Sequence, residues 1–214
     1  MLRSLLLSLC LSVPAITVFA QSDLFGPSEN RSVRHGVLLN INGGYDVPAG
    51  DMGKRFDNSW RLGPAVMYKT KSNWLMGARF DFITGRNVNE DSLMVNIRDK
   101  YETGKRNLYE FINNSGQRIG VPVYQRGYAV GLTLGKIFSH SKDHPDNGFV
   151  EMTTVGFMQH KINIYDKDRT VEQLNDGLRK GYDRLTNGLF VGQYVGYVYF
   201  AQNKLINFSL GLDC

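Results

Sequence analysis

The sequence contains little cysteine, little proline and no long apolar run. Its 214 residues include two cysteines, Cys10 and Cys214, and six prolines. Cys10 falls in an N-terminal leader described below, so no internal disulfide is expected in the exported chain. After that leader, no stretch reaches the ~18 consecutive apolar residues that a membrane-spanning helix requires. These absences exclude a disulfide-stapled scaffold and argue against a helical membrane protein.

Strong charge of one sign and known catalytic motifs are also missing. The formal net charge is only +5, and the basic residues are dispersed rather than gathered in runs. Dispersed charge is typical of a solvated surface, so nucleic-acid binding is not expected. The chain contains no phosphate-binding loop, no zinc-ligand spacing and no nucleophile elbow. We therefore expect no catalytic residue, no cofactor and no metal ion, and do not expect an enzyme.

The histidines offer two weaker alternatives. His140 and His144 share a short segment with Asp143 and Asp146, which could hold a metal ion, although a solvated polar turn is the favoured interpretation. The second alternative is an outer-membrane lipid-modifying enzyme with His160 as its catalytic residue. Some small outer-membrane β-barrel enzymes use a histidine together with a nearby serine and carboxylate. No serine lies close to His160 in the sequence, which disfavours this role.

The first twenty residues predict a secretory signal peptide. Arg3 supplies a positive start, residues 5–11 are apolar, and residues 18–20 (VFA) provide a small-residue exit. A membrane anchor is the alternative, but the apolar run is short and Pro14 interrupts it. The predicted organisation is a signal peptide at 1–20, a periplasmic segment at 21–34 and an outer-membrane barrel domain at 35–214.

The rest of the sequence is rich in segments that alternate between apolar and small or polar residues. In residues 124–138, for example, Tyr128, Val130 and Leu132 alternate with Gly127 and Ala129, which is the period-2 pattern of a strand. One segment, 189–200, is apolar on both faces, and its orientation stays open. The seven alternating segments are 35–46, 60–69, 74–83, 124–138, 149–165, 189–200 and 205–212.

Segment lengths and connections favour a membrane barrel over a soluble sandwich. The segments are long for globular strands, which average ~5–6 residues, and suit tilted membrane strands of ~9–11. Long and short connections alternate along the chain, as in outer-membrane barrels. Aromatic residues lie near the segment ends, where interfacial girdles form. We predict an all-β, antiparallel up-and-down transmembrane β-barrel of about eight strands, with seven visible and the closing strand missing.

Several charged residues fall on the faces expected to point into the barrel. An unpaired charge enclosed there would be expensive, so these side chains are expected to pair and plug the interior. A narrow ion or small-solute channel is the functional alternative. The predicted interior charge network consists of Arg61, Lys69, Arg79, Asp81, Glu151 and Lys161.

Two connections are too long to be simple turns. Residues 86–123 and 166–186 are expected to lie outside the cell and to provide contact surfaces. Short helices are expected at 92–97 and at 171–174.

Five stretches resemble a largely uncharacterised family of small barrel proteins of the Bacteroidota outer membrane. They are residues 47–53 (VPAGDMG), 68–74 (YKTKSNW), 125–128 (QRGY), 158–162 (MQHKI) and 180–188 (KGYDRLTNG). The resemblance covers the chain from about residue 36 onward. The large connections and the absence of a catalytic site favour a structural or interaction role in the cell envelope, in contact with outer-membrane lipids, and the resemblance adds contact with other envelope or secretion-system proteins as a possibility. Similar proteins continue past residues 207–210 into a further loop and strand, so a truncated product is expected.

Overall fold

The fold is described from a computed structural model, which covers residues 13–19 (backbone only), 33–90, 92–98, 108–141, 144–166, 169–201 and 207–214. The elements are β1 (Val13–Phe19), β2 (Gly36–Asp46), α1 (Gly50–Arg55), β3 (Ser59–Lys69), β4 (Trp74–Gly85), β5 (Leu108–Ile112), β6 (Arg118–Ser139), β7 (Gly148–Ile164), the 3-10 helix η1 (Glu172–Leu174), α2 (Asp176–Arg179), β8 (Thr186–Phe200) and β9 (Asn207–Asp213).

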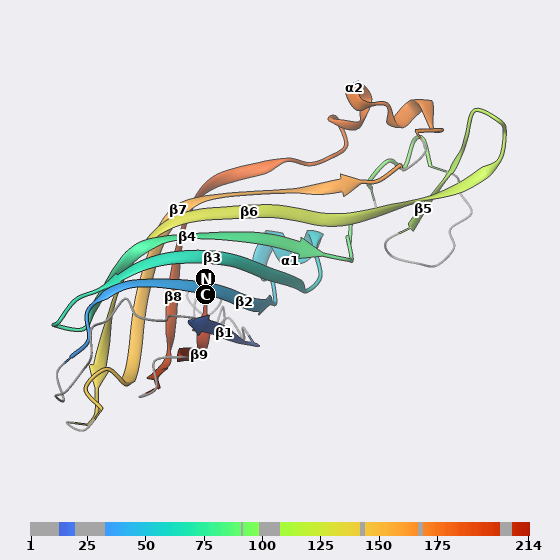
Figure 1. The fold of residues 1–214 in the computed structure, drawn as a ribbon. Coiled ribbons are helices and arrows are strands. Elements are labelled where there is room, and N and C mark those ends of the chain that lie inside the picture. The colour runs from blue at the N-terminus through green and yellow to red at the C-terminus, as the bar shows by residue number, and fades with distance from the viewer. Residues whose placement is uncertain are drawn as a thin grey trace, which may run out of the picture.

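The strands form one antiparallel sheet that curls on itself (Figure 1). Their order is β4-β3-β2-β1-β9-β8-β7-β6, and β4 also pairs with β6, so the pairings return to their starting point. Sequential neighbours pair throughout this ring, while β5 attaches to β6 outside it. The prediction of an all-β, antiparallel up-and-down barrel is confirmed.

The eighth position of the ring, where a missing closing strand was expected, is taken by β1, from the segment assigned above to the signal peptide. Its backbone pairs with β2 on one side and with β9 on the other. Both neighbours run in the same direction, so only a strand of the opposite direction can complete an antiparallel ring. Without such a strand, two rows of backbone donors and acceptors would lack partners.

Side chains alternate between a buried interior face and an exterior face that is exposed and apolar. On β6, Ala129 and Thr133 are buried, whereas Val130 and Leu132 are 46% and 71% exposed. The same inversion recurs around the sheet, with exposed large residues on each ring strand from β2 to β9. On β8, whose faces the sequence left open, Tyr194 points inward, since it is buried between exposed neighbours of the opposite parity.

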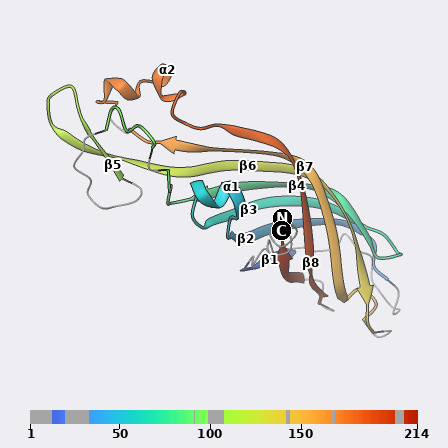
Figure 2. The ribbon, with the colours of Figure 1, turned by 180° about the vertical axis from the view of Figure 1, so that it is seen from behind.

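The two ends of the barrel differ. At one end, here called the turn end, the chain reverses through residues 70–73 and 140–147. At the other, the loop end, β6 and β7 extend beyond β3 and β4, and α1, β5 and α2 gather there (Figures 1 and 2). None of the described helices is long and apolar enough to cross a membrane.

The long connection at 86–123 contains strand pairing that was not expected from the sequence. β5 and the start of β6 form a hairpin, closed by a turn in which the side chain of Asn113 accepts hydrogen bonds from the backbone N–H groups of Ser115 and Gln117. The short helix expected at 92–97 is absent, and consecutive turns replace it. Met94 has a φ of 56°, which interrupts a right-handed helix. The helical piece expected near 171–174 corresponds to η1.

Candidate functional site

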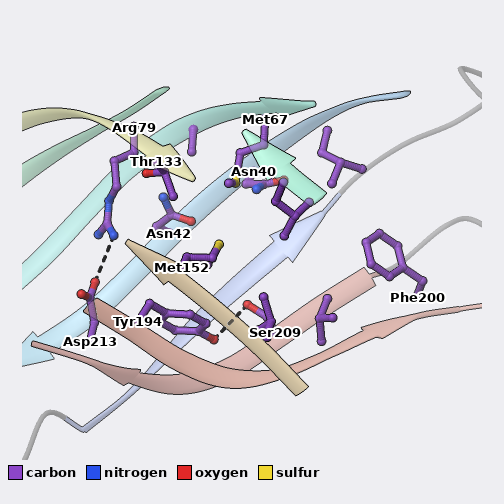
Figure 3. A pocket seen from close by; sticks show the side chains of 15 residues that line it. Asn40, Asn42, Met67, Arg79, Thr133, Met152, Tyr194, Phe200, Ser209 and Asp213 are labelled. Carbon is purple, nitrogen blue, oxygen red and sulfur yellow. Dashed lines mark hydrogen bonds and ion pairs between the residues drawn. The ribbon is translucent and has the colours of Figure 1, made fainter. Parts of the chain in front are cut away.

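An apolar plug fills the half of the barrel nearest the turn end. Its buried side chains are Leu38, Ala65, Met67, Leu75, Ile137, Val150, Tyr194, Val198 and Phe200. The Tyr194 hydroxyl donates to Ser209 Oγ at 3.1 Å, so its polar atom is satisfied within the plug (Figure 3). The cavity that remains holds about 40 Å³ for water-sized molecules, which is enough for only a few waters. The described side chains of the plug therefore fill most of the barrel interior at this level.

A layer of paired charges lies next to the plug, toward the loop end. Asp213 accepts from Arg79 Nη1 at 3.0 Å (Figure 3). It also lies 3.2 Å from Arg61 Nη2. Arg79 Nε also binds Asp81 at 2.7 Å, and Arg61 Nη2 binds Asp46 at 3.0 Å. Each arginine therefore bridges two carboxylates. Such pairing is what allows charges to stay inside a barrel, because it offsets their loss of hydration.

Lys69 belongs to a separate network at the turn end. Its side chain is 1% exposed, and Nζ donates to Asp146 Oδ1 at 2.7 Å, to Asn73 Oδ1 at 2.7 Å and to the Arg34 carbonyl at 2.8 Å. Asp146 also accepts from Arg34 Nε at 3.0 Å. The network ties the segment before β2 to both short turns and closes this end of the barrel.

Glu151 and Lys161 lie on the outward face of β7, which corrects their assignment to the interior. Glu151 is exposed and accepts from Gln193 Nε2 at 3.0 Å, and Lys161 is 40% exposed. The interior face of β7 instead carries Met152 and Ile162, because the packed layers inside the barrel require apolar side chains. Polar residues at these two positions occupy the edges of the outer apolar belt rather than its middle.

Asp81, a partner of Arg79, was in the predicted network, but the two other carboxylates that bind the arginines, Asp46 and Asp213, were not. Asp46 ends the polar face of β2, and Asp213 continues the alternation of Asn207 and Ser209 by two steps, through Gly211. Extending the period-2 pattern to the strand ends would have identified both. Asp146 lies in a turn, where no periodic signal exists, and only the fold brings it to Lys69.

A larger cavity of about 260 Å³ adjoins the charged layer on its loop-end side. Arg61, Arg79 and Asp81 line one part, and Val47 and Met52 line another. Five charged side chains in this layer bind one another, so the cavity combines a polar floor with an apolar rim. Among the described residues, no group of three His, Cys, Asp or Glu side chains lies together as a metal site would require.

The connections at the loop end fold into a head with its own apolar core. We use the term head for the buried cluster of Phe56, Val88, Leu93, Met94, Tyr109, Phe111, Val121, Val123, Ile162, Ile164, Val171 and Leu174, with the segments that carry them. These residues come from three separate connections and from the ends of β6 and β7. The shared core makes the head one packed unit rather than three independent loops.

Polar contacts join the same connections. Glu90, after β4, lies 3.1 Å from Arg55 of α1 and 3.4 Å from Arg184, which precedes β8. The tip of the β5–β6 hairpin is joined to the last connection, since Asn114 N–H donates to the Thr170 carbonyl at 3.1 Å. The head is therefore fixed by both apolar burial and cross-connections.

His160 sits where the barrel meets the head. It is 9% exposed, and its ring meets Phe56 edge-on at 5.5 Å between centroids. Its Nδ1 has no hydrogen-bond partner among the described residues. No described serine or carboxylate binds it, so the contacts of His160 are those of a packed core residue.

Comparison of the chain with protein families, with curated proteins and with solved structures gave no match.

Proposed function

We propose that this chain is an integral β-barrel of the outer membrane with a structural or interaction role in the cell envelope. The observation that carries the proposal is the combination of a filled barrel with an ordered head built from its long connections. Because the interior of the barrel is occupied, specific contacts with other molecules are expected at the head.

The outward face supports a membrane location. It is apolar around the ring, with aromatic side chains toward both ends, including Trp60 near the loop end and Tyr68 near the turn end of β3. The two aromatic side chains are eight positions apart, which corresponds to roughly 26 Å along the strand and, at a tilt of ~40°, to roughly 20 Å along the barrel axis. An apolar band of ~25 Å between aromatic girdles is typical of outer-membrane barrels.

The alternative functions have less support. A small-solute channel requires an open interior, whereas the plug and the paired charges occupy it. A lipid-modifying enzyme built on His160 requires a nucleophile and a carboxylate next to that histidine. The imidazole ring of His160 instead packs against Phe56. The resemblance noted above suggests a more specific form of the proposal, in which the barrel is an accessory of a secretion machinery.

Site-specific photo-crosslinking in living cells tests the interaction role. A crosslinker at Leu178 of α2, which is 60% exposed on the head, should capture a discrete envelope protein. The matched control is the exposed turn-end residue Ser72, which should not capture the same protein. Repeated recovery of the uncrosslinked barrel from several head positions, including Ile112, would refute the interaction role.

A further inference from the structure

The outward face carries two cations directly opposite each other near the loop end. Arg126 of β6 and Lys161 of β7 are register partners in the antiparallel ladder, and both point outward. Directly opposed side chains have Cβ atoms ~4.5–5.5 Å apart, and like charges at that spacing are destabilising. An anion bound between the two cations would make this arrangement favourable.

The same two strands carry a neutral counterpart at the other end of the belt. There Lys136 of β6 is the register partner of Glu151 of β7, so opposite charges face each other. Lys136 also lies over the rings of Trp74 and Phe138, at 5.2 and 5.9 Å from their centroids. The β6–β7 pair thus carries two positive charges at its loop end and one charge of each sign at its turn end. Aromatic side chains lie next to the charged residues at both ends.

Protein groups offset only part of the charge at the loop-end pair. Asp183 lies 3.6 Å from Lys161 Nζ, which is a long contact for an ion pair, and the Lys161 side chain is 40% exposed. Among the described residues Arg126 has no carboxylate partner, and its guanidinium lies over the rings of Tyr124 and Phe82 at 5.3 and 5.8 Å. Stacking holds the guanidinium against the barrel wall and leaves its N–H groups available for an anion.

We propose that Arg126 and Lys161 form a binding site for the phosphate group of a membrane lipid in the outer leaflet. The proposal rests on the membrane location argued above. Arginine binds phosphate through two parallel N–H···O bonds, and lysine adds a point charge from the neighbouring strand. On the same outward face of β6, Val130 and Leu132 are exposed next in line toward the middle of the belt. A lipid with its phosphate at the cation pair would lay its acyl chains on this apolar surface.

Native mass spectrometry of the full-length protein tests the site. The protein is reconstituted in phosphatidylcholine vesicles containing phosphatidic acid as a minor component, then released in mild detergent, and the lipids that stay bound are counted. Wild type should retain phosphatidic acid in preference to phosphatidylcholine. The double variant Arg126→Gln/Lys161→Gln should lose roughly tenfold of that preference, since two charge-assisted contacts disappear. Lys161→Glu, which gives Arg126 a partner of opposite charge on the neighbouring strand, should lose it as well.

Lys136→Gln is the matched control, because it removes a cation from the same strand at the other aromatic ring. It should keep the wild-type preference, and an equal loss there would overturn the proposal. Inorganic phosphate that displaces phosphatidic acid at equal concentration would also overturn it, because the site would then recognise a free anion. Vesicle flotation separates this inference from the proposed function. A protein that does not float with vesicles contradicts both, whereas one that inserts without a lipid preference contradicts only the phosphate site.

Discussion

Single buried residues decide whether the turn end of the barrel stays closed. Lys69 is enclosed and donates to three oxygen atoms from separate segments, including Asp146. Replacing Lys69 by Met removes these bonds and leaves Asp146 paired only with Arg34. Breaking a buried pair costs about 3–5 kcal/mol, and the remaining arginine should reduce the loss of unfolding free energy to about 2–3 kcal/mol. Urea unfolding of the refolded barrel, followed by tryptophan fluorescence, measures the difference.

Lys54→Met is the control for that substitution. Lys54 also binds a carboxylate at 2.8 Å, that of Asp51, but both side chains are exposed on α1. The hydrogen bond from Lys54 lowers the pKa of Asp51, yet water screens this pair and its loss should leave the unfolding midpoint unchanged. Equal midpoint shifts for Lys54→Met and Lys69→Met would contradict the role assigned to the buried network.

At the level of elements, the close approach of β3 and β4 depends on glycine. A Cβ atom added at Gly63 would lie 1.8 Å from the carbonyl oxygen of Phe80. Pro64 follows directly and has no N–H to donate, so the ladder is already weak there. Gly63→Ala should force the strands apart and lower the free energy of unfolding by about 1–3 kcal/mol. Heat-dependent gel mobility of the folded barrel, together with urea unfolding, reports the change.

Gly44→Ala on β2 provides the comparison. The nearest atom to its added Cβ is Arg61 Nη2 at 3.6 Å, which is ordinary contact with a flexible side chain. This variant should fold with nearly wild-type stability. A loss at Gly44 as large as that at Gly63 would show that glycine content in general, rather than the β3–β4 approach, sets the stability.

For the whole molecule, the sorting of connections predicts a single orientation. The head and the other long connections should face outside the cell, and residues 70–73 and 202–204 should face the periplasm. Trypsin added to intact cells should first cut within 100–118, a range that ends at the exposed Arg118. Lys71, in the turn of the opposite end, should be cut only after the outer membrane is permeabilised. Mass spectrometry of the released peptides identifies the order of cleavage. Early cleavage at Lys71 while the head stays intact would show that the orientation is the opposite of the predicted one.

Much of the fold could be predicted from period-2 alternation alone. The seven expected segments correspond to β2, β3, β4, β6, β7, β8 and β9, because strands that separate an apolar exterior from a polar interior carry the pattern in their own residues. The hairpin of β5 was missed because five residues are too few for a periodic signal. Residues 202–206, which include the tight turn expected at 202–204, lie outside the described residues.

The sequence by itself determined the strands, most of their faces and the sorting of long and short connections, since these follow from local periodicity and turn chemistry. Only the tertiary structure decided which charges meet. Asp213 reaches Arg79, and Asp146 reaches Lys69, across 134 and 77 positions of the chain. It also decided that Lys161 faces outward opposite Arg126, because the faces of β7 depend on which side chains the packed interior requires. Pairing between distant strands depends on register and closure, and no local window of sequence contains that information.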